Sequence, residues 1–333
     1  MWEELAEYAR WTPSPHNVQP WQLRVRSEAE ADLFYVPERL LPAEDPLGRF
    51  LMVALGIFIE NLAVAARARG FDIEPDYADV AALDSAAAAP ALFARLRLVP
   101  APARDDFDPE LIVARRTSRV AYDGRPVPTP VLAELADICS EYGNTFVSSS
   151  DPSLVSWVLA LNRDTLFEDM TNAKTRREVG SWLRFSEREA RRKRDGFSPS
   201  CLGFPGWLLY AFFHYRGFFE LPGLRQAVRR LYFRTMRGTS TIAWFVGPFD
   251  NPEDWTRSGR LLARLWLTLT REGLHLHPFG SIITNEPAHE RLRARLEHDP
   301  SQGALWFIMR LGASTEPPRS ARLRRDDILI PRP

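Results

Sequence analysis

The stretch PSPHNVQPW, residues 13–21, joins the first helix that the sequence predicts to its first strand. Pro13 ends an amphipathic helical pattern, and the alternation that follows the stretch is typical of a half-buried strand. Between them Ser14, His16 and Asn17 are displayed on a short loop that prolines make rigid. Polar side chains on such a loop suit recognition of a planar heterocycle with donors and acceptors on its edge. The alternative is a capped helix–strand connection whose Ser and Asn bond only to backbone.

The composition is that of a globular protein without an obvious charged partner. The chain has 333 residues, of which 45% are hydrophobic and 26% charged, and its formal net charge is zero. Zero net charge gives no electrostatic case for a nucleic acid or an anionic membrane, so neither is an expected partner. The only cysteines, Cys139 and Cys201, form no CxxC motif and are expected to be small buried residues. The first helix lacks the features of a signal peptide, and we expect a cytoplasmic protein.

Two apolar stretches are long enough to be considered as membrane spans. Residues 50–66 are interrupted by Glu60 and Asn61, and we interpret them as a buried core helix. Residues 202–221 contain Pro205 together with charged or polar side chains and three glycines. This second stretch is open to three interpretations: a lid, a core segment or an interfacial patch.

The order of elements predicts an α+β protein with mixed sheets flanked by long helices. Helices are expected over 1–12, 47–69, 109–116, 130–142, 251–273 and 286–298, a long charged helical region over 151–194, and strands over 21–26, 33–36, 92–99, 145–148, 241–246 and 304–311. A Pro-rich, charged segment predicts a boundary near residue 108, giving units of 1–108 and 109–333. Both units contain a long helix that ends in glycine, Gly70 in one and Gly273 in the other, so we interpret them as an internal duplication.

The stretch RRTSR, residues 115–119, is the clearest anion-binding candidate. Arg115, Arg116 and Arg119 lie within five residues and can surround a phosphate with charge-assisted hydrogen bonds. The alternative is a solvated helix end, because nearly all basic residues of this chain are arginine.

Other chemistries find little support. His275 and His277 could face one way on a strand, but no acidic or Cys ligand lies at a standard spacing, so no metal site is expected. A serine hydrolase built on Ser14 or Ser281 is disfavoured because no G-x-S-x-G motif occurs.

The first of these motifs resembles a family signature. PSPHNVQPW resembles the PSxxNxQPW signature of the flavin-dependent nitroreductase superfamily, and RRTSR followed by a Pro-rich loop resembles its RRSxR motif. In ordinary members RRSxR comes first, and two subunits form an intertwined dimer with flavin at the interface. Here the order is reversed, as in the Acg-like branch, in which two half-domains are fused. Further stretches extend the resemblance over nearly the whole chain: DPLGRFLMVALG, NLAVAARARG, WLRFSEREARRKRDGF, PEDWTRSGRLLARLWLTLTREGL, WFIMRLG and an Arg-rich tail.

The resemblance implies a nitroreductase-like fold whose two halves form an intramolecular pseudo-dimer with one complete FMN site. It implies that Arg115, Arg116 and Arg119 hold the ribityl phosphate, with Arg322 as a second phosphate contact. Pro13, Ser14, His16 and Asn17 would line the isoalloxazine or the ribityl chain. The loop Phe279, Gly280 and Ser281 would offer backbone N–H groups to the flavin edge; the alternative there is a plain connection between helices.

The expected function is that of an FMN-dependent oxidoreductase, which passes a hydride from NAD(P)H to a small organic substrate or oxidises a dedicated one. No catalytic side chain is named. An aromatic-rich insertion at about 196–238 is expected to act as a lid over the flavin, with extra core packing or a partner surface as alternatives. A flavin-sequestering protein and a scaffold without flavin are the competing functions. The internal pseudo-dimer makes a monomer possible, with a homodimer as the alternative.

Overall fold

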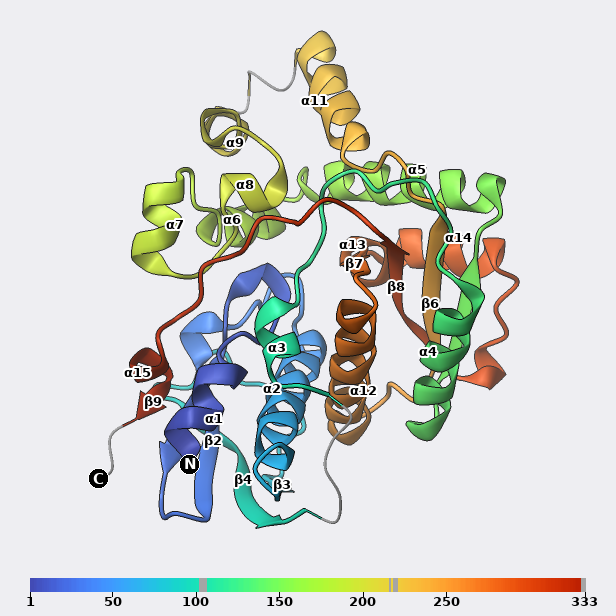
Figure 1. Ribbon diagram of the computed structural model, residues 1–333. Helices are drawn as coiled ribbons and strands as arrows, with labels where there is room; N and C mark the ends of the chain where they lie inside the picture. The colour runs from blue at the N-terminus through green and yellow to red at the C-terminus, as the bar shows by residue number, and fades with distance from the viewer. Residues whose placement is uncertain (102–106, 216, 218–220, 331–333) are drawn as a thin grey trace.

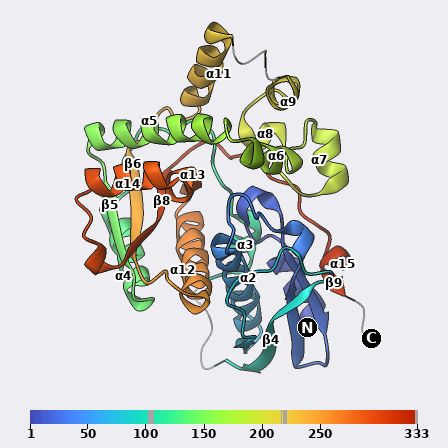
Figure 2. The ribbon, with the colours of Figure 1, turned by 180° about the vertical axis from the view of Figure 1, so that it is seen from behind.

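Two β-sheets lie on either side of a central pair of long helices, with a layer of shorter helices above them (Figure 1, Figure 2). The computed structural model describes residues 1–101, 107–215, 217 and 221–330. The centre of the expected linker, 102–106, and residues 216 and 218–220 of the insertion lie outside the described residues. The class is α+β, as the sequence predicts.

The first sheet is mixed, as expected, and has the strand order β3-β4-β2-β1-β9. Strand β1 begins at Trp21 of the quoted stretch and pairs antiparallel with β2, Trp21 opposite Tyr35. The sequence did not predict β3, whose Pro75 and acidic residues break the usual strand pattern. The strands are β1 (Trp21–Val25), β2 (Glu30–Tyr35), β3 (Phe71–Tyr77), β4 (Ala91–Pro100) and β9 (Leu329–Ile330).

The second sheet has the order β5-β6-β8-β7, and its named strands all pair antiparallel. Its central strands are almost entirely buried, which explains their continuous apolar sequences. The strands are β5 (Thr145–Ser149), β6 (Thr241–Gly247), β7 (His275–Pro278) and β8 (Ala304–Gly312).

The central helices are α2 (Arg49–Arg67) and α12 (Pro252–Arg271). They cross so closely that a Cβ on Gly56 would lie 2.1 Å from the carbonyl oxygen of Thr256. A Cβ on Gly259 would lie 2.1 Å from the carbonyl oxygen of Val53. The two contacts are reciprocal. Thr256 follows Val53 in the sequence by the same number of residues as Gly259 follows Gly56, so each contact is the counterpart of the other.

A buried acid joins the same two helices. The Glu60 side chain on α2 is 1% exposed and pairs with Arg67 at 3.1 Å, Arg260 at 2.8 Å and Arg264 at 3.1 Å. These guanidinium groups hold the pKa of Glu60 below its usual value against the opposing effect of burial. In length and composition α2 could cross a membrane, but residues 51–66 are all buried inside the protein, as expected of a core helix.

The long charged helical region expected over 151–194 is helical, but it is divided into three separate helices. Asn172 caps the second by accepting from the N–H groups of Lys174 and Thr175, and Ser186 caps the third by accepting from the Glu189 N–H. The three helices are α5 (Pro152–Asp169), α6 (Ala173–Ser181) and α7 (Glu187–Lys193).

The remaining helices cover the sheets or form the upper layer. In both views α9 and α11 lie at the end of the molecule that is away from the two termini. There α11 is above α5, and α9 is above α8. These helices are α1 (Trp2–Ala9), α3 (Glu110–Ala114), α4 (Thr129–Glu141), α8 (Pro199–Leu202), α9 (Gly206–His214), α11 (Pro222–Arg234), α13 (Gly280–Thr284), α14 (Glu286–Arg295) and α15 (Arg325–Ile328), with short 3₁₀ turns at Pro15–Asn17, Pro37–Arg39 and Pro300–Gln302.

The tail after β8 returns across the molecule to the first sheet (Figure 1). There β9 pairs parallel with β1, Leu23 opposite Leu329. The first sheet is therefore built mainly from residues before 108 but is completed by a strand from the far end of the sequence. The boundary near residue 108 stays a prediction.

Candidate active site

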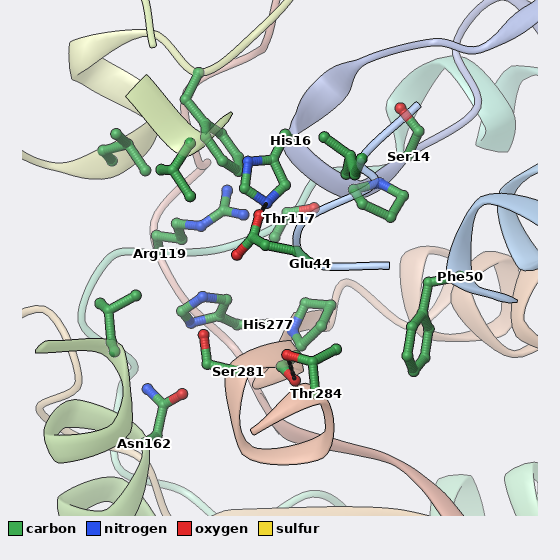
Figure 3. Close-up of a pocket in the computed structure, with 18 of the residues that line it drawn as sticks. Ser14, His16, Glu44, Phe50, Thr117, Arg119, Asn162, His277, Ser281 and Thr284 are labelled. Atoms are coloured by element: carbon green, nitrogen blue, oxygen red, sulfur yellow. Dashed lines mark hydrogen bonds and ion pairs between the residues drawn. The ribbon is translucent and has the colours of Figure 1, made fainter. Parts of the chain in front are cut away.

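A cavity of about 400 Å³ is lined by both halves of the chain and by the insertion. The loop after α1 and the start of α2 form one wall, and residues Thr117, Arg119 and His277 to Thr284 face them (Figure 3). Helices α5, α9 and α11 supply an apolar region, with Leu208 and Phe212 among its side chains. Polar groups thus gather in one part of a cavity whose other walls are apolar, which is typical of a small-molecule site.

The loop of the quoted stretch is held in an unusual backbone conformation. His16, Asn17 and Gln19 have φ values of +50°, +56° and +55°. Few residues other than glycine adopt this left-handed region, so surrounding bonds must hold the loop there. The Asn17 amide donates to the carbonyls of Gly196 and Ala321, both at 3.0 Å.

Gln19 fastens the same loop. Its amide donates to the Arg194 carbonyl at 2.9 Å and its side-chain oxygen accepts from the Leu323 N–H at 2.8 Å. The loop is thereby tied to the insertion and to the tail. Of the polar residues expected there to face a ligand, Ser14 and His16 line the cavity, while the amide nitrogen of Asn17 is used in fastening the loop.

His16 forms an ion pair on the cavity wall. Its Nε2 lies 2.7 Å from Oε2 of Glu44, and its ring packs 5.2 Å from that of Phe197 (Figure 3). Glu178 lies close by and accepts from the backbone N–H groups of Ala43 and Glu44. The pair joins the loop of the quoted stretch to the turn before α2 beside the cavity.

Four arginines gather next to the cavity. The guanidinium carbon of Arg115 lies 4.6 Å from the centre of the Trp266 ring. The Arg116 guanidinium donates to the carbonyls of Val113, Ala114 and Arg115. Burial lowers the pKa of each of Arg115, Arg319 and Arg322, the positive charges of neighbouring arginines add to the effect, and for Arg322 the pKa falls to about 10. Burial also lowers the pKa of Arg116.

This arginine cluster is poorly neutralised by the described residues. Among the described residues its ion pair joins Arg116 to Glu316 at 3.7 Å, and the Glu316 side chain is 84% exposed. The Nε atoms of Arg115, Arg116 and Arg322 are buried without a partner among the described residues. Buried donors without partners are costly, so the cluster fits an anion with several acceptor oxygens, such as a phosphate.

Arg119 lies apart from that cluster and faces the cavity. Its guanidinium lies 4.9 Å from the centre of the Phe197 ring. Opposite it, burial and the charges of Arg310 and Arg119 hold the pKa of His277 well below its usual value, so its imidazole is neutral. The Nδ1 atom of His277 is buried without a partner among the described residues, so it remains available to a ligand.

The segment expected to approach a flavin edge is the end of β7 and the start of α13. The Phe279 ring is buried in the core and its N–H donates to the Ile308 carbonyl, so this N–H is not free. Gly280 and Ser281 line the cavity and form the first turn of α13, where N–H groups lack acceptors within the helix. Burial raises the pKa of the nearby Asp169 to about 6.

The structure therefore divides the expected site residues into three groups. Those that line the cavity are Pro13, Ser14, His16, Arg119, Gly280 and Ser281. Those in the adjacent arginine cluster are Arg115, Arg116 and Arg322. Asn17 and Phe279 lie behind the wall and position it.

Sequence reasoning missed several polar groups of the site. Glu44, Thr117 and His277 line the cavity, and Arg319 belongs to the arginine cluster. The signal for Arg319 was present, because it precedes Arg322 in the same Arg-rich tail. Glu44 gave no signal, since only the fold brings it to His16. The described residues contain no group of three metal-ligating side chains, which leaves the pair His275 and His277 without further ligands.

Comparisons with known proteins give sequence relatives but no matching family model. A protein of Mycobacterium tuberculosis strain H37Rv, whose name places it with NAD(P)H nitroreductases, is 30% identical over 177 residues. That match covers 51% of this chain and 47% of the relative, so the chain spans about half the length of that relative. PigM of a Serratia strain, named for the same class, is 24% identical over 84% of this chain and 80% of its own.

Solved structures give only distant likeness. The FMN- and NADPH-dependent nitroreductase NfnB from a Sphigopyxis strain is 15% identical and covers 67% of this chain at a TM-score of 0.40. A nitroreductase with bound FMN from Bacteroides fragilis is 14% identical and covers 67% at 0.39. These aligned regions cover 98% and 97% of the two structures, but scores of this size do not by themselves establish a shared fold. The sequence relatives support the resemblance of this chain to the nitroreductase superfamily.

Proposed function

We propose that this chain is an FMN-dependent oxidoreductase of the nitroreductase superfamily that uses NAD(P)H and a small organic substrate. The observation that carries the proposal is the arginine cluster, because its unpartnered buried donors lie beside a cavity built from both halves. Arg115, Arg116, Arg319 and Arg322 would hold the ribityl phosphate. When bound, FMN supplies the hydride chemistry, which no side chain of this protein can perform alone.

The residues of the chain would then bind and orient. Arg119 and the neutral His277 offer donors and an acceptor to polar atoms in the cavity, and the first turn of α13 offers the N–H groups of Gly280 and Ser281. The apolar walls of α5, α9 and α11 exclude water from the reacting centre. The His16 and Glu44 pair lies at the cavity wall, where it can orient a bound molecule.

We also propose that the chain is a fused pseudo-dimer of the Acg-like type, with units of 1–108 and 109–333. The reciprocal contacts of Gly56 with Thr256 and of Gly259 with Val53 support this, because equivalent residues meet in this way across a two-fold axis. A monomer would then have its dimer-like interface already inside the chain. Light scattering after size exclusion tests this expectation, and a concentration-independent dimer would contradict it.

The test of the flavin site compares two neighbouring arginines. Arg322→Gln removes a guanidinium that donates to the carbonyl of its own neighbour Ala321 and whose Nε is buried, whereas Arg324→Gln removes an exposed guanidinium. Purified protein should show flavin absorption bands and release FMN on denaturation. Titration of the apoprotein should give a Kd for FMN about 10-fold or more weaker for Arg322→Gln and unchanged for Arg324→Gln. A protein that stays colourless after incubation with FMN would refute the proposal.

A second candidate function, flavin sequestration, is favoured by the position of α9. Its Leu208, Leu209, Phe212 and Phe213 form part of the cavity wall, as expected of a lid. Anaerobic stopped-flow mixing of the flavin-loaded protein with NADH or NADPH separates the two functions. Rapid bleaching of the flavin absorption supports the oxidoreductase, and a flavin that stays oxidised supports sequestration.

A further inference from the structure

The upper layer exposes several large apolar side chains to solvent. Four of the eight large apolar side chains that are exposed among the described residues lie within residues 207–221. Trp207 is 69% exposed, Tyr210 43%, Tyr215 59% and Leu221 56%. Helix α9 therefore has two apolar sides, one facing the cavity and one facing solvent.

A groove rich in arginine lies on the neighbouring helix. It is formed by α11, the turn after it and one residue of α5, and its lining is Arg163, Gln226, Arg229, Arg230, Phe233, Arg234 and Arg237. Asp164 is an acidic neighbour of this groove and pairs with Arg163 and Arg229. Across the part of the chain that the structure describes, no ion pair involves Arg230, Arg234 or Arg237, and all three are exposed. The groove therefore carries a local positive charge that the zero net charge of the chain conceals.

Both features occupy the same end of the molecule. Figures 1 and 2 show α9 and α11 as neighbours at one end of the molecule, α11 above α5 and α9 above α8, away from the two sheets and the termini. Leu221 immediately precedes α11, so exposed apolar residues lead into the arginine helix. Exposed Trp, Tyr and Leu beside unpaired arginines form the pattern of a surface that rests on a membrane with anionic headgroups.

We propose that α9 and α11 dock this protein on an anionic bilayer surface. The arginines of the groove contact lipid phosphates, and Trp207, Tyr210 and Leu221 enter the interfacial region. A nucleic acid is the less fitting polyanion, because Phe233 is the one aromatic side chain that lines the groove, while Trp207, Tyr210 and Leu221 lie outside it. Docking in this way turns the outer side of α9 toward the bilayer while its inner side lines the cavity. The proposal does not depend on the flavin.

The experiment measures co-sedimentation of the full-length chain with vesicles. One set is pure phosphatidylcholine and the other contains about 30% phosphatidylglycerol, at about 0.1 M and 0.5 M salt. We expect binding to the anionic vesicles only, and weaker binding at the higher salt. Arg230→Glu with Arg234→Glu should weaken binding at least about 25-fold, taking about fivefold for each arginine near an anionic surface.

Matched variants distinguish binding through this surface from non-specific electrostatic or hydrophobic binding elsewhere on the protein. Arg95→Glu with Arg257→Glu changes two exposed arginines elsewhere by the same charge and should bind like the wild type. Trp207→Ser should weaken binding about 10-fold, whereas Phe71→Ser, at another exposed aromatic, should not. Circular dichroism and thermal unfolding confirm that each variant is folded.

Three results would overturn the proposal. The first is no sedimentation of the wild type with anionic vesicles at the lower salt, and the second is equal losses in the two charge-reversed pairs. The third is binding of inorganic phosphate or of a DNA fragment at this groove without binding to vesicles. That result would assign the groove to a different partner.

Discussion

The close crossing of α2 and α12 gives a prediction that stability measurements can test directly. Gly56→Ala places a Cβ at the crossing of α2 and α12, 2.1 Å from the Thr256 carbonyl oxygen and 3.1 Å from Cα of Gly259. Two effects oppose each other. Alanine favours the helix by about 1 kcal/mol relative to glycine. The methyl group needs roughly 1 Å more space than the crossing provides, and overpacking of this kind costs about 1–3 kcal/mol or more.

The contact is with backbone, which cannot rotate away as a side chain can. The cost should therefore lie at or above the upper end of that range, and we expect Gly56→Ala to lower the free energy of unfolding by about 2 kcal/mol net. Urea unfolding followed by far-ultraviolet circular dichroism measures this difference. Because the contact is reciprocal, Gly259→Ala should cost a similar amount.

The double variant tests whether the two sites share one contact. Once the first methyl group has pushed the helices apart, the second needs less further movement. The double variant should therefore cost less than the sum of the single ones by about 0.5 kcal/mol or more. Gly223→Ala is the control, because a Cβ at this helical glycine would meet nothing within 4 Å. A Gly56→Ala protein that is more stable than the wild type would refute the close crossing.

Three further predictions concern buried groups. Glu60→Gln leaves three arginines without their shared carboxylate and should cost about 3 kcal/mol in urea unfolding, whereas an unchanged midpoint would show that these ion pairs contribute little. Burial raises the pKa of Asp45 to about 6, so between about pH 4 and 6 the unfolded chain has lost a proton that the native protein keeps, and stability falls as pH rises. Asp45→Asn should therefore be more stable than the wild type at pH 7.5 by up to about 3 kcal/mol and similar to it at pH 4, and the reverse order would contradict this sign. Burial raises the pKa of Cys139 to about 12, so iodoacetamide at pH 8 should label it only in unfolded protein, as mass spectrometry of the labelled peptide can show.

The sequence predicted the elements whose patterns are local and strong. Helices α2 and α12 have long apolar patterns and end before glycines at positive φ, and Asn251 caps α12 by accepting from the Asp254 N–H, as expected. The breaks within 151–194 were missed although the signal was present. Ser186 and Glu189 have the spacing of a helix start, and charge alone does not distinguish one long helix from three short ones.

The site was predictable only where its residues lie in short motifs. Ser14, His16 and Arg119 reach the cavity, but the bonds that shape the loop come from residues near 195 and 322, which no local pattern connects to residue 17. The same holds for Glu44, which meets His16 only through the turn before α2. The positive surface of α11 was missed for another reason. The net charge of the whole chain is zero, and this total does not show where arginines gather on the folded protein.

The return of the tail to the first sheet sets an order on the synthesis of this protein. Strand β1 is made early, yet the edge that β9 covers stays open until residues 329–330 have left the ribosome. Asn17 and Gln19 likewise wait for Ala321 and Leu323 before their loop can be held in place. An open strand edge invites pairing with other chains. The nascent first half is therefore the form of this protein that most needs a chaperone, and its cavity can close only after residues 321–330 have been made.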